Sequence, residues 1–159
     1  MFSVKKLIFL WFFVISTSPL LHAADQLADK KVLTLSGAKT IAAAAEVEAK
    51  QNKWNVVIAV VDDGGHLIYL QRIDGAPTGS IDVAIGKART AAVFRRPTKV
   101  FDELAKTRPS ITSISNVVLL EGGVPVTVGG QVVGAVGVSG ASSQQDVQIG
   151  KAGIAALEI

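Results

Sequence analysis

The chain has 159 residues, of which 16 are basic and 13 acidic, and it contains no cysteine. Without cysteine it can form neither a disulfide nor a nucleophilic thiolate. The basic residues form no stripe interleaved with aromatic residues, so nucleic acid is not an expected partner. This length allows one domain with a substantial hydrophobic core.

The first 23 residues have the pattern of a secretory signal peptide. Two lysines precede an apolar run at residues 7–15, which has the length of a signal h-region and is too short to span a bilayer. We expect cleavage after Ala23, with Ala24 as the second choice, and a periplasmic or secreted protein without stable membrane insertion. An uncleaved membrane anchor, the alternative, would need a longer apolar run.

Cleavage would leave residues 24–159 as a single domain. Both lysines of the signal segment leave with it, so 14 basic and 13 acidic residues remain and the net charge falls from +3 to +1. The basic character of the whole chain therefore overstates the charge of the processed protein.

The processed chain offers few metal ligands. Its one histidine is His66 and its one tyrosine is Tyr69, because His22 and Met1 lie in the signal segment. A structural zinc site takes four ligands, usually including histidine or cysteine, so we expect no metal site. A haem held by one axial residue remains open, whereas methionine or cysteine ligation from within the processed chain is excluded.

The first elements predicted are a helix and a buried strand. Residues 33–52 place alanine and isoleucine at helical spacing, with Ser36 as the expected N-cap. Residues 56–61 are six consecutive apolar residues, which indicates a strand buried on both faces.

A partner strand is predicted over residues 66–73, across the turn at residues 62–65. His66 and Tyr69 are three positions apart, so on a regular strand they point to opposite faces. These two side chains are therefore not expected to act on one small site.

The middle of the chain predicts a second helix over residues 80–94, capped by Ser80. A short amphipathic helix follows at residues 100–106, and then a loop at residues 108–116. Residues 117–120 predict a brief strand that leads into the next hairpin.

That hairpin is the most glycine-rich part of the chain. Residues 124–128 and 132–139 predict two strands joined by Gly129-Gly130, a two-residue turn that allows positive φ at both positions. Glycine inside a strand marks a close approach by a backbone, a helix or a ligand, and packing and ligand binding both remain open here. Residues 143–146 have a capping-box pattern and start the last helix, which runs to about residue 157.

This order of elements predicts an α+β fold with a five-stranded antiparallel sheet and helices packed against it. We expect the helices to cover one face of the sheet well and the other poorly. A monomer would then expose a large apolar patch to water, so we expect at least a homodimer.

Two stretches carry a resemblance to a known family. VVIAVVDDGGHLIYLQRIDGAPTGSIDVAIGKARTAAVFRRPT and EGGVPVTVGGQVVGAVGVSGASSQQD, in this order and spacing, resemble the GlcG/HbpS-like family. This is the haem-degrading domain that also forms the C-terminal part of PduO-type proteins. The resemblance covers about residues 33–157. It implies an α+β sheet fold, homo-oligomers of dimer size or larger, and haem binding in several members, some of which are reported to degrade haem with peroxide.

The positions that match the family pattern are mostly of kinds that serve structure. Glycines suit turns and close packing, Asp146 suits a helix cap, and Arg72, Asp74 and Lys87 can pair to tie a strand end to a helix. The matching positions are Arg72, Asp74, Lys87, Thr90, Phe94, Gly122, Gly123, Pro125, Gly134, Gly137, Ser139, Gly140 and Asp146. In the member whose first helix has a histidine thought to bind haem, the corresponding helix here has Glu46, Val47 and Glu48 and no histidine.

Two functions follow as hypotheses, and no residue is assigned a catalytic role in either. The first is an exported, oligomeric, haem-binding protein, with haem degradation as a further activity. Its expected cofactor contacts are His66, Arg72, Lys87, Arg95 and Arg96, the last two holding the propionates by charge-assisted hydrogen bonds. The second is a non-catalytic protein that binds another small molecule where Arg72, Lys87 and Glu121 converge, or that partners a sensor or transport system.

Overall fold

The structure, a computed structural model, describes residues 26–158, so the predicted signal peptide and its cleavage site lie outside the described residues. The chain divides into two compact units, and the helices and strands below belong to the second unit, Lys31–Ile159. Within residues 26–158, no helix has the length and apolar character needed to cross a membrane.

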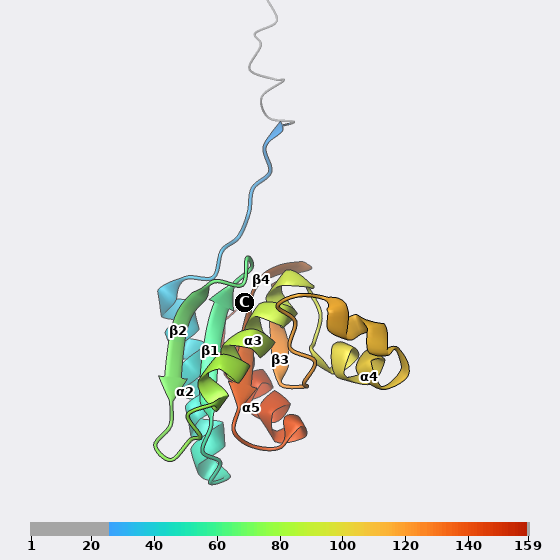
Figure 1. Ribbon diagram of the computed structural model, residues 1–159. Helices are drawn as coiled ribbons and strands as arrows, with labels where there is room; N and C mark the ends of the chain where they lie inside the picture. The colour runs from blue at the N-terminus through green and yellow to red at the C-terminus, as the bar shows by residue number, and fades with distance from the viewer. Residues whose placement is uncertain (1–25, 159) are drawn as a thin grey trace, which may run out of the picture. The chain divides into compact units, whose positions relative to one another are not determined.

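Four strands form one antiparallel sheet in the order β2–β1–β4–β3 (Figure 1). β1 (Val57–Asp62) and β2 (Leu67–Arg72) form the first hairpin, and β3 (Gly123–Val128) and β4 (Gln131–Ser139) form the second. β1 pairs with β4, so these two strands are central and β2 and β3 lie at the edges. The α+β antiparallel prediction is confirmed, but its number of strands, five, is wrong.

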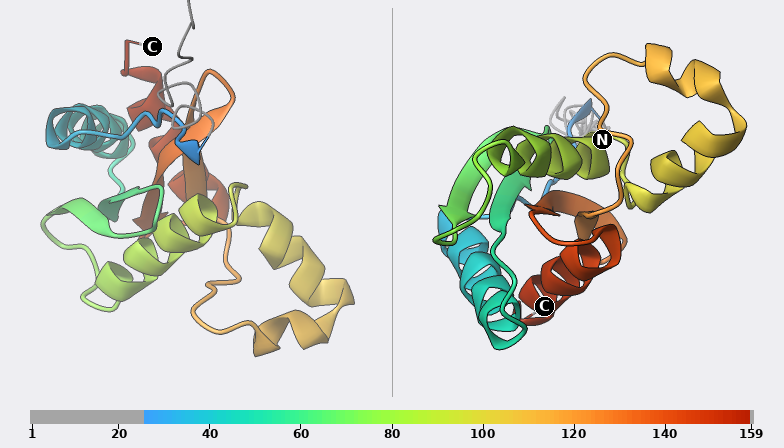
Figure 2. Two further views of the ribbon diagram at one scale, coloured as in Figure 1. Left: turned by 90° about the horizontal axis from the view of Figure 1, so that it is seen from above. Right: turned by 60° about the horizontal axis from the view of Figure 1, so that its bottom comes forward.

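Helices cover both faces of this sheet (Figure 2). α2 (Leu35–Gln51) and α5 (Ser143–Ala155) pack on one face, and α3 (Ser80–Val93) packs on the other. The apolar residues Val56–Val61 all have an exposed fraction of 0%. One chain therefore buries both faces of β1, whereas the edge strand β2 stays partly exposed.

The fifth strand, predicted at residues 117–120, does not form in the described chain. The backbone N–H of Val118 donates to Oγ1 of Thr90, on α3, at 3.0 Å. A helix side chain thus satisfies a donor that a strand would pair with a neighbouring backbone. A short apolar run in the sequence does not show whether its backbone will pair with a strand or with a side chain.

A bulge in each hairpin interrupts the regular alternation of side chains along a strand. The β1–β2 register slips once, and Ile68 packs on the same core as Tyr69. The β3–β4 register also slips once, and Val133 joins the core that contains Val136. Strict alternation puts the members of each pair on opposite faces, and it fails because a bulge adds one residue to one strand.

Two of the three predicted helix N-caps form one or two residues away from the predicted position, and the third does not form. The side chain of Thr34, not Ser36, caps α2. A reciprocal capping box starts α5, but it is formed by Ser142 and Gln145, one residue earlier than the pattern predicted. Ser80 is the first residue of α3 and makes no capping bond.

A lobe lies beside the helix–sheet sandwich (Figures 1 and 2). It consists of α4 (Lys99–Thr107) and the 3₁₀ helix η2 (Pro109–Ser113), and we call it the α4–η2 lobe. The rings of Phe94 and Phe101 meet edge to face with centroids 5.1 Å apart, which joins the lobe to the end of α3. The segment over residues 108–116, predicted as a loop, therefore contains a helical turn.

The glycines of the second hairpin serve its turn and its packing. Gly129 and Gly130 have φ of +58° and +80°, which confirms the predicted two-residue turn. A Cβ at Gly137 would collide with the backbone of α3 at Ala84 and Ala88. Of the two roles left open for this glycine, the structure shows packing against a helix.

We expect Gly137→Ala to lower the free energy of unfolding by about 3 kcal/mol, because α3 must move away from the sheet. Gly79→Ala is the matched control, since a Cβ there meets nothing within 4 Å, and its effect should stay within about 1 kcal/mol. Urea unfolding followed by circular dichroism measures both. Equal stability of the two variants would contradict the close-packing argument.

Candidate functional site

The five residues predicted to contact a cofactor lie in different places. His66 is exposed at the β1–β2 turn. Its ring lies over that turn, because a Cβ added to Gly64 would be 3.1 Å from Cδ2 of His66. Arg95 and Arg96 are exposed in the turn between α3 and α4. Arg72 is exposed at the end of β2, and Lys87, on α3, is buried.

The predicted convergence of Arg72, Lys87 and Glu121 does not occur. Arg72 donates from Nε and Nη2 to the carbonyl of Ala76, at 3.2 and 2.8 Å, and so closes its own loop. Glu121 is buried, and its Oε1 lies 3.8 Å from Nζ of Lys99. Lys87 has a different partner.

Lys87 and Asp146 form a buried ion pair between α3 and α5. Nζ lies 2.8 Å from Oδ2, and the two side chains are 4% and 2% exposed. Lys87 Nζ also donates to the carbonyl of Val138 at 3.0 Å, and Asp146 Oδ1 accepts the N–H of Ala141 at 3.2 Å. Of the pairings that the sequence left open for Arg72, Asp74 and Lys87, the one between Lys87 and Asp74 is wrong, and Asp146 does more than cap a helix.

The chain at Gly122 passes directly over this pair. A Cβ at Gly122 would lie 2.6 Å from Nζ of Lys87, and its φ is +133°. Burial raises the pKa of the Asp146 carboxyl, while the hydrogen bond and charge of Lys87 oppose that rise. No space is left for a ligand at the ammonium group, so this pair ties α3, β4 and α5 together and does not form an open site.

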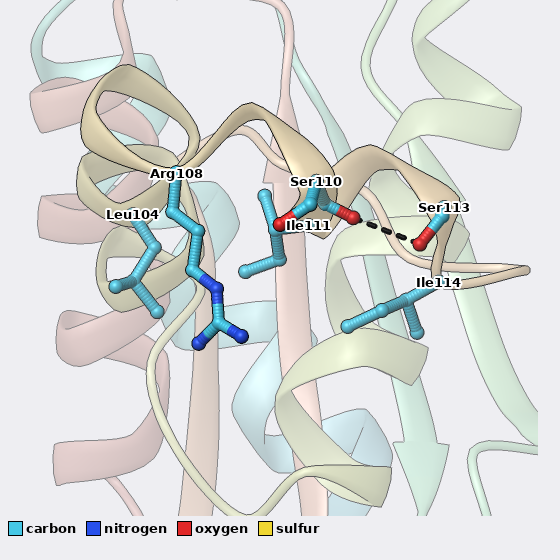
Figure 3. Close-up of a pocket in the computed structure, with 6 residues that line it drawn as sticks. All are labelled: Leu104, Arg108, Ser110, Ile111, Ser113 and Ile114. Carbon is cyan, nitrogen blue, oxygen red and sulfur yellow. Dashed lines mark hydrogen bonds between the residues drawn. The ribbon is translucent and has the colours of Figure 1, made fainter.

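A surface cavity of about 400 Å³ lies in the α4–η2 lobe (Figure 3). Its volume falls within the range of small-molecule sites. The lining residues are Leu104, Arg108, Ser110, Ile111, Ser113 and Ile114. Figure 3 shows the guanidinium of Arg108 between Leu104 and Ile111, with Ile114 on the far side.

The sequence shapes this cavity through one proline. A residue before proline disfavours the helical conformation, so α4 ends at Thr107 and Arg108 has φ −135° and ψ 80°. Pro109 then starts η2, and the hydroxyls of Thr112 and Ser113 donate to the carbonyls three residues earlier, both at 2.8 Å. The turn directs Ile111 inward, where it is 8% exposed.

The chemistry of this lining favours an apolar ligand with a negative group. Three of its side chains are aliphatic, and its only charged one is Arg108. An arginine stays protonated at any physiological pH and presents a planar fork of donors that matches a carboxylate. The six residues include no side chain that gains or loses a proton near neutral pH, so they can bind a ligand but supply no acid or base.

A second cavity, of about 510 Å³, lies at the start of α2. It holds one positive and one negative side chain, Lys31 and Glu158, so it complements an anion less well than the lobe does. Its lining consists of Lys31, Val32, Leu33, Thr34, Gly37, Val128, Val133, Leu157 and Glu158.

Neither cavity lining contains histidine, cysteine, methionine or tyrosine, or any of the five residues predicted to contact a cofactor. Within the described part of the chain, no group of three or more His, Cys, Asp or Glu side chains could hold a metal ion. Arg108 was not among the site residues predicted from the sequence. The signal that could have indicated it is an arginine directly before a proline, with Leu104, Ile111 and Ile114 nearby in the sequence.

A family model described as haem degrading protein HbpS-like matches residues 33–155. Protein GlcG of Escherichia coli K12 is 46% identical over 111 residues, which cover 69% of this chain and 83% of that protein. An uncharacterised 15.0 kDa protein of Citrobacter freundii, from the dhaT-dhaS intergenic region, is 38% identical over 119 residues, covering 72% of this chain and 84% of that protein.

Solved structures show the same fold. A double mutant of HbpS from Streptomyces reticuli superposes with a TM-score of 0.79 at 36% identity, over 84% of this chain and 92% of that one. A complex of PduOC with heme superposes with a TM-score of 0.74 at 26% identity, over 80% of this chain and 96% of that one.

The buried pair gives a prediction about stability and pH. Lys87→Met leaves the Asp146 carboxylate buried without its partner and should cost about 3–5 kcal/mol of unfolding free energy at pH 7. Burial raises the pKa of Asp146 in the folded state, so on acidification the folded protein takes up that proton before the unfolded chain does. The loss should therefore shrink as the pH falls toward 3.8, the ordinary pKa of an aspartate carboxyl.

Urea unfolding at several values between pH 7 and pH 4 measures this effect. The control is Lys50→Met, because the pair of Lys50 with Glu46 is solvent-exposed, at 62% and 27%, and such pairs contribute at most about 1 kcal/mol. The double variant Lys87→Met/Asp146→Leu should recover part of the loss. A loss for Lys87→Met that is as large at pH 4 as at pH 7 would contradict the assignment.

Proposed function

The chain belongs to the haem degrading protein HbpS-like family, the family of GlcG, and from this premise we propose that it binds haem in the cavity of the α4–η2 lobe. The observation that carries the proposal is the lining of that cavity, which joins aliphatic walls to a single arginine. Haem has the matching character, since it is a large apolar ring with two carboxylates at one edge.

The contacts would divide between ring and carboxylate. Leu104, Ile111 and Ile114 offer an apolar surface to the macrocycle, and removing that surface from water is favourable. Arg108 would hold a propionate by charge-assisted hydrogen bonds, the role first expected of Arg95 and Arg96. The heme complex of the related PduOC supports the choice of ligand.

A second candidate is a binding or accessory protein without catalytic activity, which could serve a sensor or transport system. The lining of the cavity favours it, because no side chain there can act as a general acid or base. Haem degradation would then depend on groups outside the lining, or not take place. Peroxide-dependent bleaching of bound haem well above the rate for free haemin would count against this candidate.

We expect the purified protein to bind haemin saturably, with a shift of the Soret band at micromolar protein concentration. Arg108→Gln should raise the dissociation constant about tenfold or more, because it removes a hydrogen bond to a charged group. Lys106→Gln makes the same change of charge on the exposed surface of α4, outside the cavity, and should have little effect. The absence of a Soret shift, or equal effects of the two variants, would refute the site.

We propose further that the protein is exported with cleavage after Ala23 and assembles at least as a homodimer. Leu67, on the edge strand β2, and Val93, on α3, are 48% and 50% exposed, and burial of such side chains is a reason for a chain to associate. Contacts of this kind are apolar and should persist in high salt.

One preparation tests both parts of this proposal. Protein released by osmotic shock should begin at Ala24 by N-terminal sequencing, and light scattering should give at least twice the chain mass in both low and high salt. Full-length protein in the membrane fraction would reject the export proposal. A monomer mass in ordinary buffer would reject the assembly.

A further inference from the structure

We propose that the α4–η2 cavity recognises the porphyrin ring and its carboxylates and not the iron, so that it takes metal-free and metal-loaded porphyrin dicarboxylates alike. This inference rests on the proposed function and refines it by naming the ligand class. Its basis is the identity of the side chains in the cavity and the position of the side chains that usually ligate iron.

The first observation is the lining itself. Haem iron in proteins is held by histidine, cysteine, methionine or tyrosine. The six lining residues are arginine, serine, leucine and isoleucine. The hydroxyl of Ser113 donates to the carbonyl of Ser110 at 2.8 Å, shown dashed in Figure 3, so it is engaged within its own turn.

The second observation concerns the two side chains of the described chain that could ligate iron. His66 lies at the β1–β2 turn, with its ring over that turn. Tyr69 pairs with Val60 in the sheet and packs against the core beneath α2 and α5. Neither lines the cavity, and α2 contains no histidine along its length.

The interactions that remain do not depend on a metal. Aliphatic contact follows the area of the ring that is covered, and the ring is the same with or without iron. The guanidinium of Arg108 would bind a propionate, and both forms of the porphyrin carry propionates. Affinity should therefore follow the ring and its carboxylates.

The test compares three probes on the purified exported protein: haemin, protoporphyrin IX and the dimethyl ester of protoporphyrin IX. Quenching of intrinsic fluorescence reports each titration, and competition between haemin and protoporphyrin IX shows whether they share a site. We expect the first two dissociation constants to agree within about threefold, and the ester to bind about tenfold or more weakly. Arg108→Gln should weaken the first two by the same factor and leave the ester unchanged.

The outcomes separate the two levels of the proposal. Haemin binding more than about tenfold tighter than protoporphyrin IX would overturn iron-independent recognition and leave haem binding intact. Loss of haemin binding alone in His66→Ala or Tyr69→Phe would overturn it in the same way and would identify the ligand. If neither haemin nor protoporphyrin IX binds, the proposed function fails, and this inference fails with it.

Discussion

The buried contact between Lys87 and Asp146 is the constraint on which the arrangement of the second unit depends. Two charges removed from water destabilise a fold unless each finds its partners, and here Nζ reaches both a carboxylate and the Val138 carbonyl. These bonds fix α3 against the end of β4 and the start of α5. They also require the chain at Gly122 to pass where no Cβ fits. A sheet end, two helices and the entry to β3 are thus positioned by one ion pair.

Small side chains set the distances around that pair. α3 meets the sheet through Ala84 and Ala88 opposite Gly137, so helix and strand backbones approach closely. On the other face α5 approaches α2 in a similar way, since a Cβ at Gly153 would lie 2.7 Å from the carbonyl of Ile41. Apolar side chains nevertheless remain exposed on the sandwich, among them Val47 on α2, Leu67 on β2 and Val93 at the end of α3.

The sequence predicted those features that depend on neighbours along the chain. Helical spacing, the apolar run of the central strand and the Gly129-Gly130 turn all carry a local signal, and each was found within a few residues of its predicted place. What failed depends on contacts between distant segments. Lys87 and Asp146 are 59 residues apart. The N–H of Val118 bonds to the side chain of Thr90, 28 residues earlier, instead of to a strand. The candidate cavity was missed for a different reason. Its lining lies within residues 104–114, but which of these side chains share a cavity depends on how the chain turns at Pro109.

The candidate cavity lies in the lobe, outside the two hydrophobic cores of the sandwich. The ion pair, the alanine stripe and the glycine contacts lie in the sandwich, which this chain shares with HbpS and PduOC at the level of the whole fold. The α4–η2 lobe touches that sandwich through the ring pair of Phe94 and Phe101 and through Thr98, which bonds to Gly123. Substitutions in the cavity wall should therefore leave both hydrophobic cores undisturbed, because no lining residue belongs to either core. The likeness to HbpS and PduOC therefore shows the fold of this chain, whereas what the proposed site recognises depends on the side chains in the lobe.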